Sequence, residues 1–205
     1  MLTNSKQTII LLLSLLFVYG MLAFTFANPA VFWYLYAFTL LVCIAIAILS
    51  GTIEDQLPTW KFLIFGIGYG TITYGIIRLG YWLAPFINDR LVGSVQKFLT
   101  VYGPQNIWHY ILLVFIVAIG EELFWRGYVQ QQLKRFMRPV LAVIVTAILC
   151  AISIAFSGFK LGIIAALVTS LIWGFIYEWR KSMPLVIVAH VVFVLLLFLV
   201  LPLTS

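Results

Sequence analysis

The sequence is short of charge: only 9% of its 205 residues are Asp, Glu, Lys or Arg. A soluble domain carries about 25% charged residues, because its surface must face water. This chain cannot cover such a surface, and it contains no long polar stretch that could fold as a separate soluble domain. We therefore expect one integral membrane domain over residues 1–205.

Cysteine, histidine and several catalytic motifs are also scarce or missing. The two cysteines, Cys43 and Cys150, lie in apolar runs outside any CxxC pattern, so we predict neither a disulfide framework nor a thiolate metal site. The chain has two histidines and no HExxH, so a zinc protease site is unsupported. It also lacks a Gly-x-Ser-x-Gly elbow and a Walker loop. We predict no metal and no cofactor.

Long apolar runs are what the sequence has in excess. Hydrophobic residues make up 64% of the chain, and its mean hydropathy is +1.16. About 20 apolar residues in a helix cross a hydrocarbon core of about 30 Å. The runs predict an all-α transmembrane bundle of seven helices, at roughly 8–27, 30–51, 60–86, 107–138, 140–157, 161–178 and 183–202. The first run is longer than the apolar core of a signal peptide, so we interpret it as a retained helix.

The segment 88–106 separates the third and fourth runs and contains both polar and apolar residues. Its apolar residues recur near helical spacing, which predicts a short helix lying in the membrane interface. These residues are Leu91, Val92, Val95, Phe98 and Leu99.

The formal charge of +6 arises from basic residues at the ends of the apolar runs. Membrane topology explains this placement better than nucleic-acid binding, so we expect the lipid bilayer and no nucleic acid as a partner. With the N-terminus inside, seven basic residues lie inside and three outside, which favours a cytoplasmic N-terminus and an extracytoplasmic C-terminus in a cell membrane. The inside set is Lys6, Lys61, Lys134, Arg135, Arg138, Arg180 and Lys181; the outside set is Arg90, Lys97 and Lys160.

Two of the four glutamates, Glu121 and Glu122, are adjacent in the fourth run, where a buried carboxylate is costly unless it is paired, protonated or wet. Glu122 and Arg126 are four residues apart and can pair on one helix face. Glu121 is turned by about 100° and lacks that partner, which suits it as a general base for activating water. Three interpretations stay open: a structural ion network, a transport-type proton site, and a catalytic or formerly catalytic site.

His190 lies in the seventh run, eight residues past Ser182 and so about 12 Å from the basic end of its helix. Glu121 and Glu122 precede the basic end of the fourth helix, on the same side of the membrane. The three side chains are therefore predicted to meet in one cavity open to the cytoplasm.

Two further polar residues are not expected in that cavity. His109 precedes Glu121 by twelve residues, or about 18 Å of helix, and is predicted to belong to an aromatic belt with Trp108 and Tyr110. Arg78 lies within the third run, and we expect its side chain to snorkel outward rather than line the cavity.

The pattern Glu121-Glu122-x-x-x-Arg126 resembles a motif of the CAAX-protease and bacteriocin-processing (CPBP, or Abi) family of intramembrane glutamate endopeptidases. The stretch 174–190, which runs from a glycine-bearing helix through a short turn to a histidine, is similar to that family's third-motif region. The resemblance covers roughly residues 105–200, and it implies a CAAX-protease-like core.

The resemblance implies a role for each of the four polar residues. Glu121 would activate water, and Glu122 and Arg126 would be its supporting pair. His190 would stabilise the developing oxyanion.

The sequence departs from the family pattern at three positions. The second motif calls for Phe and His where this chain has Cys150 and Ile154, and the third calls for Asn where it has Val194. Loss of a proton acceptor or an oxyanion donor typically costs orders of magnitude in rate. We therefore favour a non-catalytic or weakly active relative that binds and regulates another membrane protein or peptide, as in the cell envelope or peptide immunity. The alternative is an active endopeptidase that cleaves a membrane-associated peptide near the cytoplasmic face.

Overall fold

Helices form all the regular structure of residues 4–88 and 90–203, the part of the chain described by this computed structural model. Each of the seven predicted apolar runs forms a helix, so the predicted all-α membrane bundle is confirmed. Six helices are long and apolar enough to cross a membrane: Ser5–Ala27, Pro29–Ser50, Thr59–Ile87, Ile107–Leu133, Lys160–Arg180 and Met183–Val200. The seventh, α8 (Pro139–Ala155), has 17 residues, which is near the lower limit for a membrane span.

The first half of the chain forms α1 (Asn4–Ala27), the 3₁₀ turn η1 (Pro29–Val31), α2 (Phe32–Ser50), α3 (Thr59–Ile87) and α4 (Arg90–Tyr102). The predicted break at Asn28 is present, and the side-chain amide of Asn28 donates to the carbonyl of Phe24 at 2.7 Å. The predicted short helix at 88–106 is α4. Its Phe98 and Tyr102 rings pack against each other, and Phe98 also stacks on Phe159.

The fourth run forms a single continuous span built of five consecutive pieces, which we call the central span. They are α5 (Ile107–Leu112), the π-helical turn η2 (Leu113–Val117), α6 (Ala118–Glu122), the π-helical turn η3 (Leu123–Val129) and α7 (Gln130–Leu133). The predicted end at residue 138 was too late: the span ends at Leu133, and residues 134–138 form the turn into α8. Short π-helical insertions are frequent at functional sites, and these two flank the glutamates.

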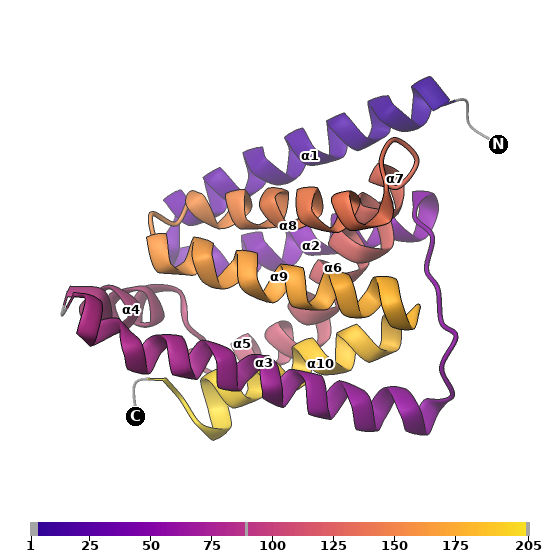
Figure 1. The fold of residues 1–205 in the computed structure, drawn as a ribbon. Helices are drawn as coiled ribbons and strands as arrows, with labels where there is room; N and C mark the ends of the chain where they lie inside the picture. Colours follow the sequence, from indigo (N-terminus) through magenta and orange to yellow (C-terminus); the bar gives the residue numbers. More distant parts are fainter. Residues whose placement is uncertain (1–3, 89, 204–205) are drawn as a thin grey trace.

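The last part of the chain forms α8, α9 (Lys160–Arg180), α10 (Met183–Leu195) and the π-helical turn η4 (Leu196–Val200). Figure 1 shows α1, α2, α8 and α9 on one side of the molecule and α3 with α10 on the other. The central span runs between them and packs against both α2 and α10. Its glutamates are therefore in the middle of the bundle rather than on the lipid-facing surface.

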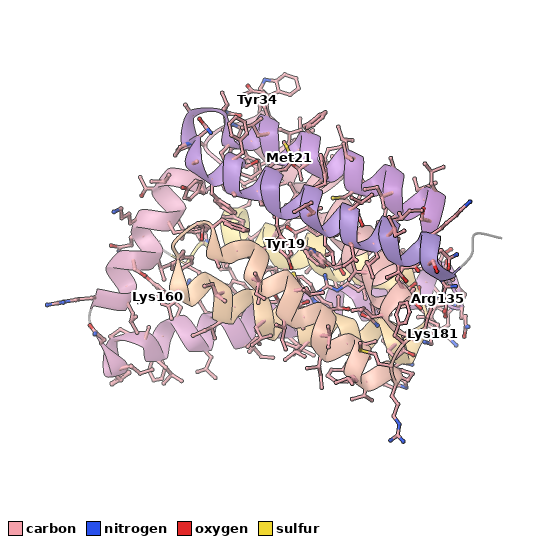
Figure 2. The ribbon with its side chains drawn as sticks, turned by 90° about the horizontal axis from the view of Figure 1, so that it is seen from above. Tyr19, Met21, Tyr34, Arg135, Lys160 and Lys181 are labelled. Carbon is pink, nitrogen blue, oxygen red and sulfur yellow. The ribbon has the colours of Figure 1, made fainter. Side chains whose placement is uncertain are left out.

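The predicted inside set of basic residues gathers at one end of the bundle, which we call the basic end. Figure 2 shows Arg135 and Lys181 there and Lys160 at the opposite end. The connector 51–58 crosses the basic end and binds the turn between α9 and α10. The Met183 amide donates to the Glu54 carbonyl at 2.8 Å, and the Ser182 hydroxyl donates to the Asp55 carboxylate at 2.7 Å.

Two glycines bring α3 into close contact with α10, the helix that carries His190. A Cβ atom on Gly66 would lie 2.7 Å from a methyl carbon of Val188, and one on Gly70 would overlap the carbonyl oxygen of Ala189. Small residues spaced by four let the backbones of membrane helices approach closely. Van der Waals packing then holds the helices together, because lipid provides no hydrophobic force between them. The spacing of these glycines therefore fixes where α10 lies.

A bulky residue at Gly70 should separate the two helices. We expect Gly70→Leu to lower the free energy of unfolding by about 1–3 kcal/mol, the usual cost of overpacking, measured by thermal unfolding in detergent. Gly68→Leu is the matched control, because a Cβ atom there meets nothing within 4 Å. Equal stability of the two variants would contradict the proposed close packing.

Candidate functional site

The central span, α9 and α10 bring the four predicted site residues into one cluster. Glu121 and Glu122 end α6, Arg126 lies in η3, and His190 lies in the middle of α10. The cluster is buried among apolar side chains, so every charge in it depends on its neighbours for compensation.

Glu122 and Arg126 form the predicted ion pair at the centre of the cluster. Their side chains are 0% and 1% exposed. Arg126 Nη1 donates to Glu122 Oε1 at 3.3 Å, while Nε approaches Oε2 at 3.3 Å without the alignment of a hydrogen bond. Arg126 Nη2 also donates to the hydroxyl of Ser170 at 2.9 Å. The pair therefore links the central span to α9.

His190 lies between the two carboxylates. Its Nδ1 is 2.8 Å from Glu122 Oε1, and its Nε2 is 4.0 Å from Glu121 Oε2. The indole of Trp173 stacks on the imidazole, with 4.3 Å between ring centroids. The hydrogen bond with Glu122 and the stacked indole together fix the orientation of the histidine ring.

Glu121 faces a different side of the helix from Glu122, as the sequence predicts. Its side chain is 20% exposed, and its carboxylate accepts a short hydrogen bond from the hydroxyl of Tyr36 on α2. Tyr36 was not predicted as a site residue. It lies 85 positions earlier, in a run rich in aromatic residues where one tyrosine gives no distinguishing signal.

Glu121 also borders a small cavity between the central span and helices α1, α2, α8 and α9. Its volume is about 50 Å³, which suffices for a few water molecules but not for a peptide segment. Trp173, Cys43 and Cys150 contribute to its wall. The indole Nε1 of Trp173 is buried and has no hydrogen-bond partner among the described residues.

Two polar residues predicted to lie outside this cluster are indeed elsewhere. The His109 ring stacks on Trp33, with 4.9 Å between ring centroids. The backbone amide of His109 donates to the side-chain oxygen of Asn106, which caps α5. The Arg78 guanidinium donates to the carbonyl of Pro202 at 2.7 Å, near the end of α10 and η4. Neither His109 nor Arg78 lines the Glu121 cavity.

The two cysteines are free thiols that both line this cavity. Within residues 4–88 and 90–203, no group of three or more His, Cys, Asp and Glu side chains is arranged to hold a metal ion.

The resemblance noted in the sequence rests on the paired glutamates, the arginine one turn later and the histidine from a distant helix. A comparison with known families supports this resemblance. Residues 103–196 match the Rce1-like family of type II CAAX prenyl endopeptidases. The matched segment contains the central span, α8, α9 and α10, and so all four predicted site residues. Searches of curated proteins and of solved structures found no significant match.

The structure also locates the positions at which the Rce1-like segment departs from the family pattern. Ile154 and Cys150, which replace the expected His and Phe, both line the cavity beside Glu121. Val194, which replaces the expected Asn, is buried one turn after His190 on α10. At position 154, an apolar side chain therefore faces the cavity where a proton acceptor is expected.

Removing one partner of the Glu122–Arg126 pair should leave an uncompensated buried charge. We expect Arg126→Met to lower the free energy of unfolding by about 3–5 kcal/mol, measured by thermal unfolding in detergent. The double variant Glu122→Gln/Arg126→Met should lose less than the sum of the single losses, because both charges leave together. Arg138→Met, at an exposed position, is the control. Additive losses in the double variant would show that the pair is not coupled.

Proposed function

We propose that this membrane protein binds an extended segment of a membrane-associated peptide or protein beside Glu121 and does not cleave it efficiently. One observation carries the proposal. The Glu121 carboxylate reaches a cavity with hydrogen-bonding groups, but that cavity has Ile154 where the related endopeptidases are expected to supply a histidine. On the distribution of basic residues, we place the basic end at the cytoplasmic face.

The polar groups of the cavity suit a peptide backbone. The indole N–H of Trp173 is a buried donor without a partner, and a buried donor left unpaired is costly, so a peptide carbonyl there would be favoured. The Glu121 carboxylate supplies an acceptor for a peptide N–H. Because the cavity holds only about 50 Å³, binding requires the helices around it to separate.

The same geometry limits hydrolysis. The Tyr36 hydroxyl already occupies one oxygen of Glu121, and Ile154 can neither accept a proton nor orient a water molecule. Val194 cannot donate to an oxyanion. Each missing group typically lowers the rate by orders of magnitude.

Peptide-bond hydrolysis by the same residues is the alternative function, and the position of His190 favours it. With His190 Nε2 4.0 Å from Glu121 Oε2, one water molecule held between the two side chains can hydrogen-bond to both atoms. Glu121 would then accept a proton from that water, and His190 would orient it.

Binding can be tested with a farnesylated peptide that ends in the Cys-aliphatic-aliphatic-X sequence, the class of substrate named for the related endopeptidases. We expect Trp173→Phe, which removes the N–H group together with part of the indole ring, to weaken binding to the protein in lipid nanodiscs about fivefold to tenfold. Trp179→Phe, at an exposed position on the same helix, should leave affinity unchanged. Equal affinity of the two variants, or no binding by the wild type, would refute the binding site.

Catalysis can be tested by restoring the missing histidine. We expect the wild type to cleave the farnesylated peptide only slowly and Ile154→His to raise the rate of cleavage by roughly 10²-fold or more, measured by mass spectrometry of the products. Ile152→His is the control, because Ile152 is exposed on the outer face of α8. Rapid wild-type cleavage that Glu121→Gln abolishes would instead establish the endopeptidase alternative.

A further inference from the structure

A second and larger pocket opens at the basic end of the bundle, away from the Glu121 cavity. Its volume is about 460 Å³, and it lies between the start of α1, the end of α2 and the end of the central span. No residue lines both this pocket and the cavity. The proposed peptide site therefore does not account for it.

The wall of this pocket is polar and held in place. Gln131 and Gln132 are buried, which is unusual for amides in so apolar a chain. Gln132 Nε2 donates to the carbonyl of Ser50 at 2.9 Å and so links the central span to α2. Gln7 Oε1, from α1, is buried and has no partner among the described residues. The pocket therefore offers an acceptor to a ligand that carries a hydroxyl or amine.

Two basic residues, Lys134 and Arg135, supply positive charge at the same pocket. Arg135 Nη1 donates to Gln132 Oε1 at 3.0 Å, which holds the guanidinium at the rim. Lys134 pairs with Glu178 at 3.0 Å, but the same carboxylate also pairs with Lys181. Burial lowers the pKa of the Lys181 amine, but its hydrogen bond to Glu178 and the other interactions around it together raise that pKa above its usual value. One acid thus faces two charged amines, and the pocket keeps a net positive charge.

The pocket lies at the level where two membrane spans end. The span of α1 begins at Ser5 and that of α2 ends at Ser50, and the ends of spans mark the headgroup region of a bilayer. Leu49, which is 84% exposed, and Ile10 form the apolar part of the wall. A ligand with a charged head in the pocket could therefore lay its apolar chains along the lipid-facing sides of α1 and α2.

From these contacts we infer that the pocket binds a phosphate group that carries a neighbouring hydroxyl, with an anionic phospholipid such as phosphatidylglycerol as its source. Arg135 and Lys134 neutralise the phosphate, and the headgroup hydroxyl donates to Gln7 Oε1. This site is independent of the proposed peptide binding, and it would anchor the junction of α1, α2 and the central span.

The test uses the full chain in neutral detergent and three probes: phosphatidylglycerol, phosphatidylcholine and inorganic phosphate. Native mass spectrometry measures bound lipid, and thermal unfolding measures stabilisation. We expect phosphatidylglycerol to bind and to raise the unfolding temperature, and phosphatidylcholine to bind at least fivefold more weakly. Arg135→Gln should weaken phosphatidylglycerol binding about fivefold. Arg138→Gln, which removes an equal charge from an exposed position outside the pocket, should have no effect.

A second variant tests the space rather than the charge. Ser50→Phe should fill the pocket and abolish the phosphatidylglycerol adduct while Arg135 remains. If inorganic phosphate raises the unfolding temperature and Arg135→Gln removes this effect, the pocket is a phosphate site whose ligand is a soluble phosphate rather than a lipid. Equal losses in Arg135→Gln and Arg138→Gln would overturn the proposal, because they would show general attraction to the basic end. Equal binding of the two lipids would also overturn it.

Discussion

The buried ion pair between Glu122 and Arg126 links the central span to α9 and α10. Arg126 reaches Ser170 on α9, and Glu122 reaches His190 on α10. In an apolar bundle neither charge is tolerated alone, so the three helices must stay together for the pair to exist. The close packing of α3 on α10 then covers the other side of the helix that carries His190. The position of His190, and with it the shape of the site, depends on this pair.

The same pair explains why two adjacent glutamates have different environments. Successive residues on a helix point about 100° apart, so only one of them can face Arg126. Glu122 takes that place and is fully buried, whereas Glu121 faces α2, the hydroxyl of Tyr36 and the small cavity. Glu121 is therefore the carboxylate that borders the cavity, and Glu122 links the central span to the neighbouring helices.

The sequence was sufficient to predict the helices and to single out the four charged or imidazole groups that the fold brings together, because an ionisable residue in an apolar run stands out. Tyr36 and Trp173 could not be predicted in the same way. Tyrosine and tryptophan are also common at membrane interfaces, so their polar atoms carry no signal until the fold brings them beside Glu121 or His190. The π-helical turns escaped prediction as well, because apolar periodicity does not distinguish them within a continuous span. Gln131 and Gln132 lay within the predicted fourth helix, near its basic end, and only the fold shows them buried.

The central claim is that Glu122 is a charged partner of Arg126 inside the bundle. Infrared difference spectroscopy between the wild type and Glu122→Gln, in detergent at neutral pH, tests it most directly. We predict that the variant loses a band of an ionised carboxylate. Loss of a protonated carboxylic acid band instead would show that Glu122 is neutral and would contradict the ion pair on which the site is built.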